Sequence, residues 1–221
     1  MSKVILVGNG FSSKEHELGE LIDSYDTVVR FNWYQTKGRE KYIGSKTDIW
    51  FTTVFDPVRV KANNRIFLHS WTWGKRYCPL FQKFKDSDLN LPRLGKTFNR
   101  LLFDIRRFIN EKNGRVNIAQ APGPEYQVFS TLALAAWWII YENKKKYCTK
   151  SGNPPLPDPP KIDLYGVDWW LMSQKNFQSD DAFESAKSFN PKLELELFSF
   201  LHQEGLIRDL HPDSDFHKFY E

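Results

Sequence analysis

The fold is decided by an apolar run that ends in a glycine turn, Val4-Ile5-Leu6-Val7-Gly8-Asn9-Gly10-Phe11-Ser12. A short apolar run followed by turn residues predicts a buried strand and a tight turn. Glycine lets the main chain come close to a ligand, and N–H groups exposed in such a turn favour an anion. The stretch therefore predicts an anion-binding turn at the end of a first strand.

Two further apolar runs also end in small polar residues. Residues 27–31 run into Asn32, and residues 48–51 run into Thr52 and Thr53. Open α/β sheets bind their ligands outside the carboxyl ends of the strands. The sequence therefore predicts a Rossmann-like α/β domain with a mostly parallel sheet, flanking helices, and a ligand site at the edge where these runs end.

The length and the charge of the chain limit its class. The 221 residues fit one domain spanning 1–221, and 41% hydrophobic with 26% charged residues is typical of a soluble globular protein. A net charge of +4 mildly favours an anionic ligand. It falls short of the clustered basic face of a nucleic-acid-binding protein, so no nucleic-acid partner is expected.

The number of cysteines and the length of the apolar runs bear on the cellular compartment of the protein. The chain has only two cysteines and no recognisable signal peptide at Met1, which favours reduced thiols in the cytoplasm. The longest apolar run, residues 132–141, is shorter than the about 20 residues that a membrane-spanning helix needs. No transmembrane segment is therefore expected.

The rest of the chain alternates between helical and strand patterns. One segment stands apart: residues 143–161 are lysine- and proline-rich and predict a polar insertion or lid within the single domain. Ser130 is the expected N-cap of an apolar helix. We expect helices at 15–22, 98–109, 130–142 and 193–203, strands at 65–68, 116–119, 162–165 and 206–210, and a loop at 34–46.

The first fifty residues resemble a known family. The Gly-Asn-Gly turn, residues 18–32 and residues 38–47 are similar, in order and spacing, to the large sialyl motif of eukaryotic-type sialyltransferases. Residues 8–15 also resemble bacterial CMP-sialic-acid-dependent sialyltransferases. Residues 129–131 and 164–168 resemble the two halves of the small sialyl motif, with Leu132 in place of its glycine.

The resemblance implies an activity and a set of donor-binding residues. It implies a glycosyltransferase that moves an acidic sugar from a CMP-activated donor to a glycan hydroxyl with inversion, with no metal ion and no other cofactor. Because the chain lacks the membrane anchor and the cysteine pair of the Golgi enzymes, we expect a microbial or viral cytoplasmic enzyme. The implied donor-binding residues are Gly8, Asn9, Gly10, Ser12, Asn32, Ser130, Thr131, Tyr165, Gly166 and Asp168.

The chemistry of these residues suits a cytidine monophosphate group. Asn9 and Gly10 offer an amide and a backbone N–H to the phosphate and the ribose, and Asn32 offers both a donor and an acceptor. Ser130 and its neighbour add hydroxyls at the positive end of a helix. Asp168 is placed to accept a hydrogen bond from the exocyclic amine of the base.

The sequence does not identify a single catalytic base. Inverting transfer needs a group that takes the proton of the acceptor hydroxyl. The family's histidine is expected near position 189, where this chain has Phe189, with Glu194 at the acidic position five residues later. His211, directly after the last predicted strand, and His217 are the histidine candidates. Carboxylates in the same region are further candidates: Asp180, Asp181 and Glu184.

Two other functions remain open. The first is a sugar-nucleotide or glycan-binding module of the same fold that has lost catalysis, which Phe189 and Leu132 favour. The second is a nicotinamide-dependent enzyme. Against it, the turn lacks the third glycine of the dinucleotide fingerprint, and no acidic residue ends the second strand.

Overall fold

In this computed structural model, the described residues include six parallel strands that form one sheet. The structure describes residues 3–52, 66–68, 104–105, 107–114, 130–142, 161–167 and 191–211. The strand order is β4-β3-β2-β1-β5-β6, with β1 and its glycine turn near the centre. The strands are β1 (Val4–Val7), β2 (Thr27–Phe31), β3 (Ile49–Thr52), β4 (Ile66–Leu68), β5 (Ile162–Tyr165) and β6 (Ile207–Asp209).

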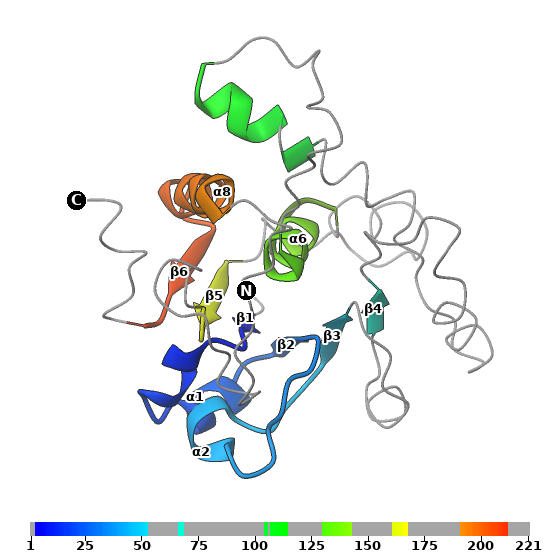
Figure 1. Cartoon of the computed structure of the whole chain (residues 1–221), viewed down its shortest axis with the longest axis vertical. Coiled ribbons are helices and arrows are strands. Elements are labelled where there is room, and N and C mark those ends of the chain that lie inside the picture. Colours follow the sequence, from blue (N-terminus) through cyan, green and yellow to red (C-terminus); the bar gives the residue numbers. More distant parts are fainter. Residues whose placement is uncertain are drawn as a thin grey trace, which may run out of the picture.

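Helices cover both faces of the sheet, which explains why nearly all residues of β1, β2 and β3 are buried. In Figure 1, α6 (Thr131–Trp137) and α8 (Pro191–Gln203) lie on one face, and α1 (Gly19–Asp23) and α2 (Glu40–Ile43) lie on the other. Alternate residues of β1 enter the two cores: Val4 and Leu6 pack with the first pair of helices, and Ile5 and Val7 with the second pair.

The register aligns the carboxyl ends of the strands. Val7, the last residue of β1, lies opposite Arg30 of β2 and Tyr165 of β5. On the far side of β5, Leu164 lies opposite Asp209 of β6. The predicted Rossmann-like parallel sheet is confirmed, and the residues that follow its strands share one edge.

The connections on the α1/α2 face differ from the prediction in detail. Residues 15–22 were expected to be helical, but a 3-10 turn η1 (Phe11–Lys14) comes first and α1 begins only at Gly19. The expected loop 34–46 contains the short helix α2. The two helices touch at Gly19, where a Cβ atom would lie 1.8 Å from the carbonyl oxygen of Glu40. We infer that this packing contact stabilises α2, because the polar sequence of residues 34–46 taken alone predicts a loop.

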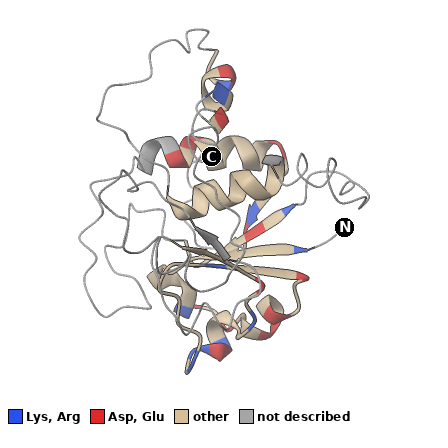
Figure 2. Ribbon diagram, turned by 90° about the vertical axis from the view of Figure 1, so that its right-hand side faces the viewer, with Lys and Arg blue, Asp and Glu red and all other residues tan. Residues whose placement is uncertain are grey.

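Most of the later expectations are confirmed. Helix α6 begins after Ser130 and continues as a π-helical turn, η2 (Trp138–Glu142), and the expected strand 162–165 is β5. Residues 143–160 of the expected insertion at 143–161, and the expected strand 116–119, lie outside the described residues. Within the described ranges, no helix has the length and apolar character needed to cross a membrane. Figure 2 shows basic and acidic residues intermixed along the ribbon.

Candidate functional site

The glycine turn is bonded directly to the end of β5. The N–H of Gly8 donates to the carbonyl of Tyr165 over 2.8 Å, and the N–H of Gly10 donates to the carbonyl of Gly166 over 2.8 Å. A Cβ atom on Gly8 would lie 2.3 Å from the oxygen of Gly166. Two of the predicted donor-binding segments are therefore in contact. The two glycine N–H groups hold the turn against β5, whereas the sequence predicted that they would face an anion.

The end of β5 also contacts the first connection of the chain, which runs from β1 to β2. Gly166 has a φ of +68°, and a Cβ atom there would lie 2.6 Å from the Cβ of Ser13. The hydroxyl of Tyr165 lies 3.0 Å from the carbonyl oxygen of Ser13 and 2.8 Å from that of His16. Burial raises the pKa of Tyr165 to about 12, so the phenol keeps its proton and donates to these oxygens. These contacts join the glycine turn and the end of β5 into one platform.

Asn9 and Asn32 connect this platform to β2 and β3. The side-chain amide of Asn9 donates to the carbonyl of Phe31 over 3.1 Å, and its buried Oδ1 has no hydrogen-bond partner among the described residues. Asn32 has a φ of +45°, a left-handed conformation that asparagine tolerates. Its N–H donates to Phe51 and its carbonyl accepts from the Trp50 indole, both over 2.9 Å. The carboxyl ends of β1, β2, β3 and β5 therefore present one polar edge.

Ser130 caps helix α6 and contacts helix α8. Its Oγ accepts a hydrogen bond from the N–H of Ala133 over 3.2 Å and donates to Oε1 of Glu194. Thr131 is the first residue of the helix. The Glu194 side chain is buried, and its second oxygen, Oε2, has no partner within the described part of the chain. Burial raises the pKa of Glu194 to about 7, against the lowering effect of Ser130.

This carboxyl group makes the stability of the protein depend on pH. The ordinary pKa of the group is 4.5 and the folded value is higher, so the folded state binds more protons than the unfolded state between these values. The contribution is fully present below pH 4.5 and is lost as the pH rises through 7. We expect Glu194→Gln to flatten this part of the profile, whose slope for one group is at most about 1.4 kcal/mol per pH unit.

Urea unfolding at several pH values between about 4 and 8 checks this expectation. Glu196→Gln, on the same helix but partly exposed, is the matched control and should keep the wild-type profile. If both variants kept that profile, Glu194 would not be titrating in this range.

His211 lies at the same edge of the sheet, beyond β6, as the sequence predicted. It is 5% exposed, and its Nε2 lies 2.9 Å from Oε2 of Glu15. Its ring packs edge-on against that of His16, with the ring centroids 4.9 Å apart. Sequence reasoning named His211 but missed both partners, because no local pattern links positions separated by 196 residues. His217 and Asp168 lie outside the described residues.

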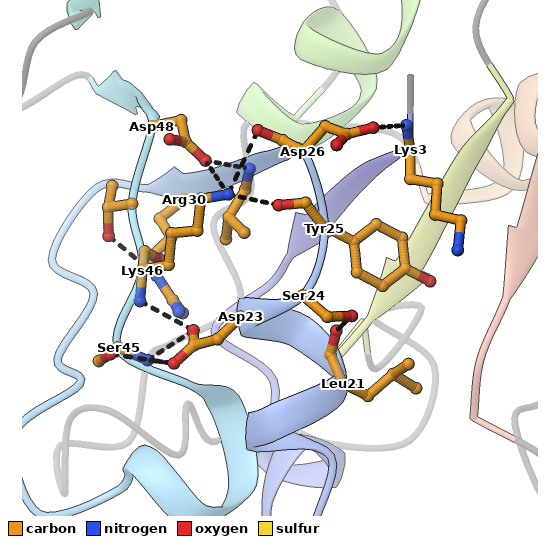
Figure 3. A network of polar contacts seen from close by, with 12 residues as sticks. Lys3, Leu21, Asp23, Ser24, Tyr25, Asp26, Arg30, Ser45, Lys46 and Asp48 are labelled. Carbon is orange, nitrogen blue, oxygen red and sulfur yellow. Dashed lines mark hydrogen bonds and ion pairs between the residues drawn. The ribbon is translucent and has the colours of Figure 1, made fainter. Parts of the chain in front are cut away.

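Arg30 is a buried charge under the polar edge that sequence reasoning also missed. Its Nε donates to the carbonyl of Lys46 over 2.9 Å, and its Nη2 donates to that of Ile43 over 2.7 Å. Figure 3 shows Arg30 amid Asp23, Lys46 and other polar residues of the same network. Burial lowers the pKa of Arg30 to about 10, so the side chain is still charged at neutral pH. These hydrogen bonds join β2 to the last residue of α2 and to the segment between α2 and β3.

Comparisons with known sequences agree with the resemblance. The family model of glycosyltransferase family 29 (sialyltransferase) matches residues 1–92. A human CMP-N-acetylneuraminate-beta-1,4-galactoside alpha-2,3-sialyltransferase is 48% identical over 50 residues, which cover 23% of this chain and 13% of that protein. A human type 2 lactosamine alpha-2,3-sialyltransferase is 37% identical over 70 residues, which cover 30% of this chain and 21% of that protein. The match thus spans a minor part of the length of these relatives.

The fold is shared with a solved enzyme. A crystal structure of a mammalian sialyltransferase in complex with Gal-beta-1-3GalNAc-ortho-nitrophenol aligns with a TM-score of 0.53 and 17% identity, over 95% of this chain and 69% of that chain. At this identity the likeness concerns the fold. The predicted resemblance of this chain to the sialyltransferase family is therefore confirmed, in sequence over residues 1–92 and in fold over the structure.

Proposed function

We propose that this chain is a glycosyltransferase of the sialyltransferase type. It would transfer an acidic sugar from a CMP-activated donor to a glycan hydroxyl, with inversion and with no metal ion at the transfer step. One observation carries the proposal: Gly8, Asn9 and Asn32 meet at the aligned carboxyl ends of β1, β2 and β5, and all lie within the segment that the family model matches. The cytoplasmic location stays a prediction.

The donor would lie on the polar edge above the glycine turn. Oδ1 of Asn9 is a buried acceptor without a partner among the described residues, which suits a hydroxyl donor such as that of a ribose. Asn32 stands at the end of the neighbouring strand, held by backbone contacts to β3. Tyr165 and Gly166 fix the turn from the other side, and we propose that the chain following them flanks the base.

Two buried groups in the described residues suit the role of proton acceptor. Glu194 has a pKa of about 7, and a base works best when its pKa lies near the operating pH. Its contact with Ser130 places it at the start of α6. His211 is the second candidate, with its Nε2 held by Glu15. In either case the acceptor hydroxyl loses its proton to the side chain as its oxygen attacks the sugar, and the CMP group leaves with the bonding electrons.

A second candidate function is a sugar-nucleotide-binding module without catalysis. The observation in its favour is Phe189, which stands where the family's histidine is expected. A module of this kind would keep the donor contacts of the glycine turn and bind CMP with no turnover.

Turnover of the donor separates these candidates. We expect the chain to release CMP from CMP-sialic acid and to sialylate a galactose-terminated acceptor, with both products followed by mass spectrometry. Removing the true base should lower the rate about 10²- to 10⁴-fold, so Glu194→Gln and His211→Gln are compared with the control Glu196→Gln. CMP binding with neither transfer nor hydrolysis would favour the binding module.

A further inference from the structure

Three potential metal ligands meet at the polar edge beside the glycine turn. Glu15 and His16 follow η1, and His211 follows β6. Each side chain offers one ligand atom, and the three atoms lie within 4.8 Å of one another. The Nε2 of His211 is already 2.9 Å from a carboxylate oxygen of Glu15.

Two imidazole nitrogens in this cluster are buried and make no hydrogen bond within the described part of the chain. Nδ1 of His211 and Nε2 of His16 have no hydrogen-bond partner among the residues that the structure describes. His211 is 5% exposed, so water reaches little of its ring. A buried polar atom that makes no hydrogen bond is destabilising and calls for an explanation.

The backbone on both sides of the cluster is held in place. The carbonyl of His16 accepts from the buried hydroxyl of Tyr165 over 2.8 Å. The N–H of His211 donates to Oδ1 of Asp209 over 2.9 Å, directly after β6. The segments that carry the ligands are therefore anchored to β5 and β6, so ligand binding would need side-chain rotation and little backbone movement.

We propose that Glu15, His16 and His211 form a binding site for a divalent transition-metal ion of the zinc type. Two imidazoles and one carboxylate are a donor set that suits Zn²⁺ and leaves a fourth position for water. Tetrahedral bonds of about 2.1 Å place ligand atoms about 3.4 Å apart, so a pair at the 4.8 Å limit must close by about 1.4 Å. The half-exposed side chain of Glu15 and the partly buried ring of His16 have room to do so.

The ion would join two distant parts of the chain. It would link the connection after the glycine turn to the segment after β6, and so stabilise the folded state by mass action. Glu15, His16 and His211 make none of the proposed donor contacts, so the proposed metal site does not depend on the proposed function. If His211 binds the metal ion, Glu194 is the remaining one of the two buried candidates for the proton acceptor.

Metal titration of the whole chain tests the site. The protein is treated with a chelator, desalted and titrated with ZnCl₂ in a calorimeter, and Co²⁺ is added separately to record its visible absorption. We expect one saturable site, a rise in melting temperature with Zn²⁺, and a cobalt spectrum typical of tetrahedral coordination with nitrogen and oxygen ligands.

Variants assign the binding to these residues. Glu15→Gln and His211→Gln should lose the saturable site, whereas Glu17→Gln should keep it. Glu17 is the matched control because it follows the same turn and pairs with Lys41 on the surface. Because Glu15 is half-exposed, its variant should fold even if the His211 variant does not. No saturable binding, or binding that survives Glu15→Gln unchanged, would overturn the proposal. Titration of the metal-free chain with CMP tests the proposed function separately.

Discussion

Gly8→Ala is expected to abolish CMP binding and to lower the free energy of unfolding by about 3 kcal/mol. A Cβ atom at this position would lie 2.3 Å from the backbone oxygen of Gly166, a distance that real Cβ atoms do not show. The turn must then move away from β5 and break the hydrogen bonds from Gly8 and Gly10. Asn9 moves with the turn, so the donor platform is lost. Calorimetric titration with CMP and urea unfolding measure the two effects.

Gly205→Ala is the matched control for this change. Gly205 has a φ of +68°, but a Cβ atom there would meet no atom of the described residues within 4 Å. Only the left-handed backbone opposes the substitution, at a cost of about 1 kcal/mol, and CMP binding should be unchanged. A folded Gly8→Ala protein that bound CMP as tightly as the wild type would show that the turn does not hold the donor.

Arg30→Met is expected to lower the free energy of unfolding by about 3 to 5 kcal/mol. The guanidinium is fully buried and donates to the carbonyl oxygens of Ile43 and Lys46 and to the hydroxyl of Thr47. Methionine fills part of the space but leaves these oxygens without their donor. The segment that leads into β3 loses its attachment to β2. Urea unfolding at neutral pH gives the difference directly.

Arg208→Met is the control for the loss of an arginine. Arg208 makes two hydrogen bonds of 2.8 Å to Asp163, but its side chain is 66% exposed. A surface ion pair of this kind contributes about 1 kcal/mol or less. Equal losses in the two variants would mean that the buried network around Arg30 does not carry the stability assigned to it.

The sheet and the glycine turn were predictable because their signals are local. The apolar run at 4–7 can only be buried on both faces, and the residues after it suit a tight turn. Ser130 was predictable as an N-cap because its hydroxyl serves the N–H of the third residue after it, Ala133. These are contacts between neighbours in the sequence.

The partners of the site residues could not be predicted, because they come from distant parts of the chain. Ser130 meets Glu194 across 64 residues, and His211 meets Glu15 across 196. The burial of Arg30 has the same origin. A charged residue in a strand pattern indicates an exposed position, whereas the acceptors that make the burial of Arg30 favourable lie at residues 43–47, at the end of α2 and after it.

Calorimetric titration of the wild-type chain with CMP, with UMP, GDP and NAD titrated in parallel, tests whether the polar edge of the sheet holds a cytidine monophosphate group. We expect saturable binding of CMP that is tighter than that of the other three nucleotides, because the amides of Asn9 and Asn32 on this edge suit the phosphate and the ribose. Binding of NAD without binding of CMP would contradict the account and would favour a nicotinamide-dependent enzyme on the same sheet.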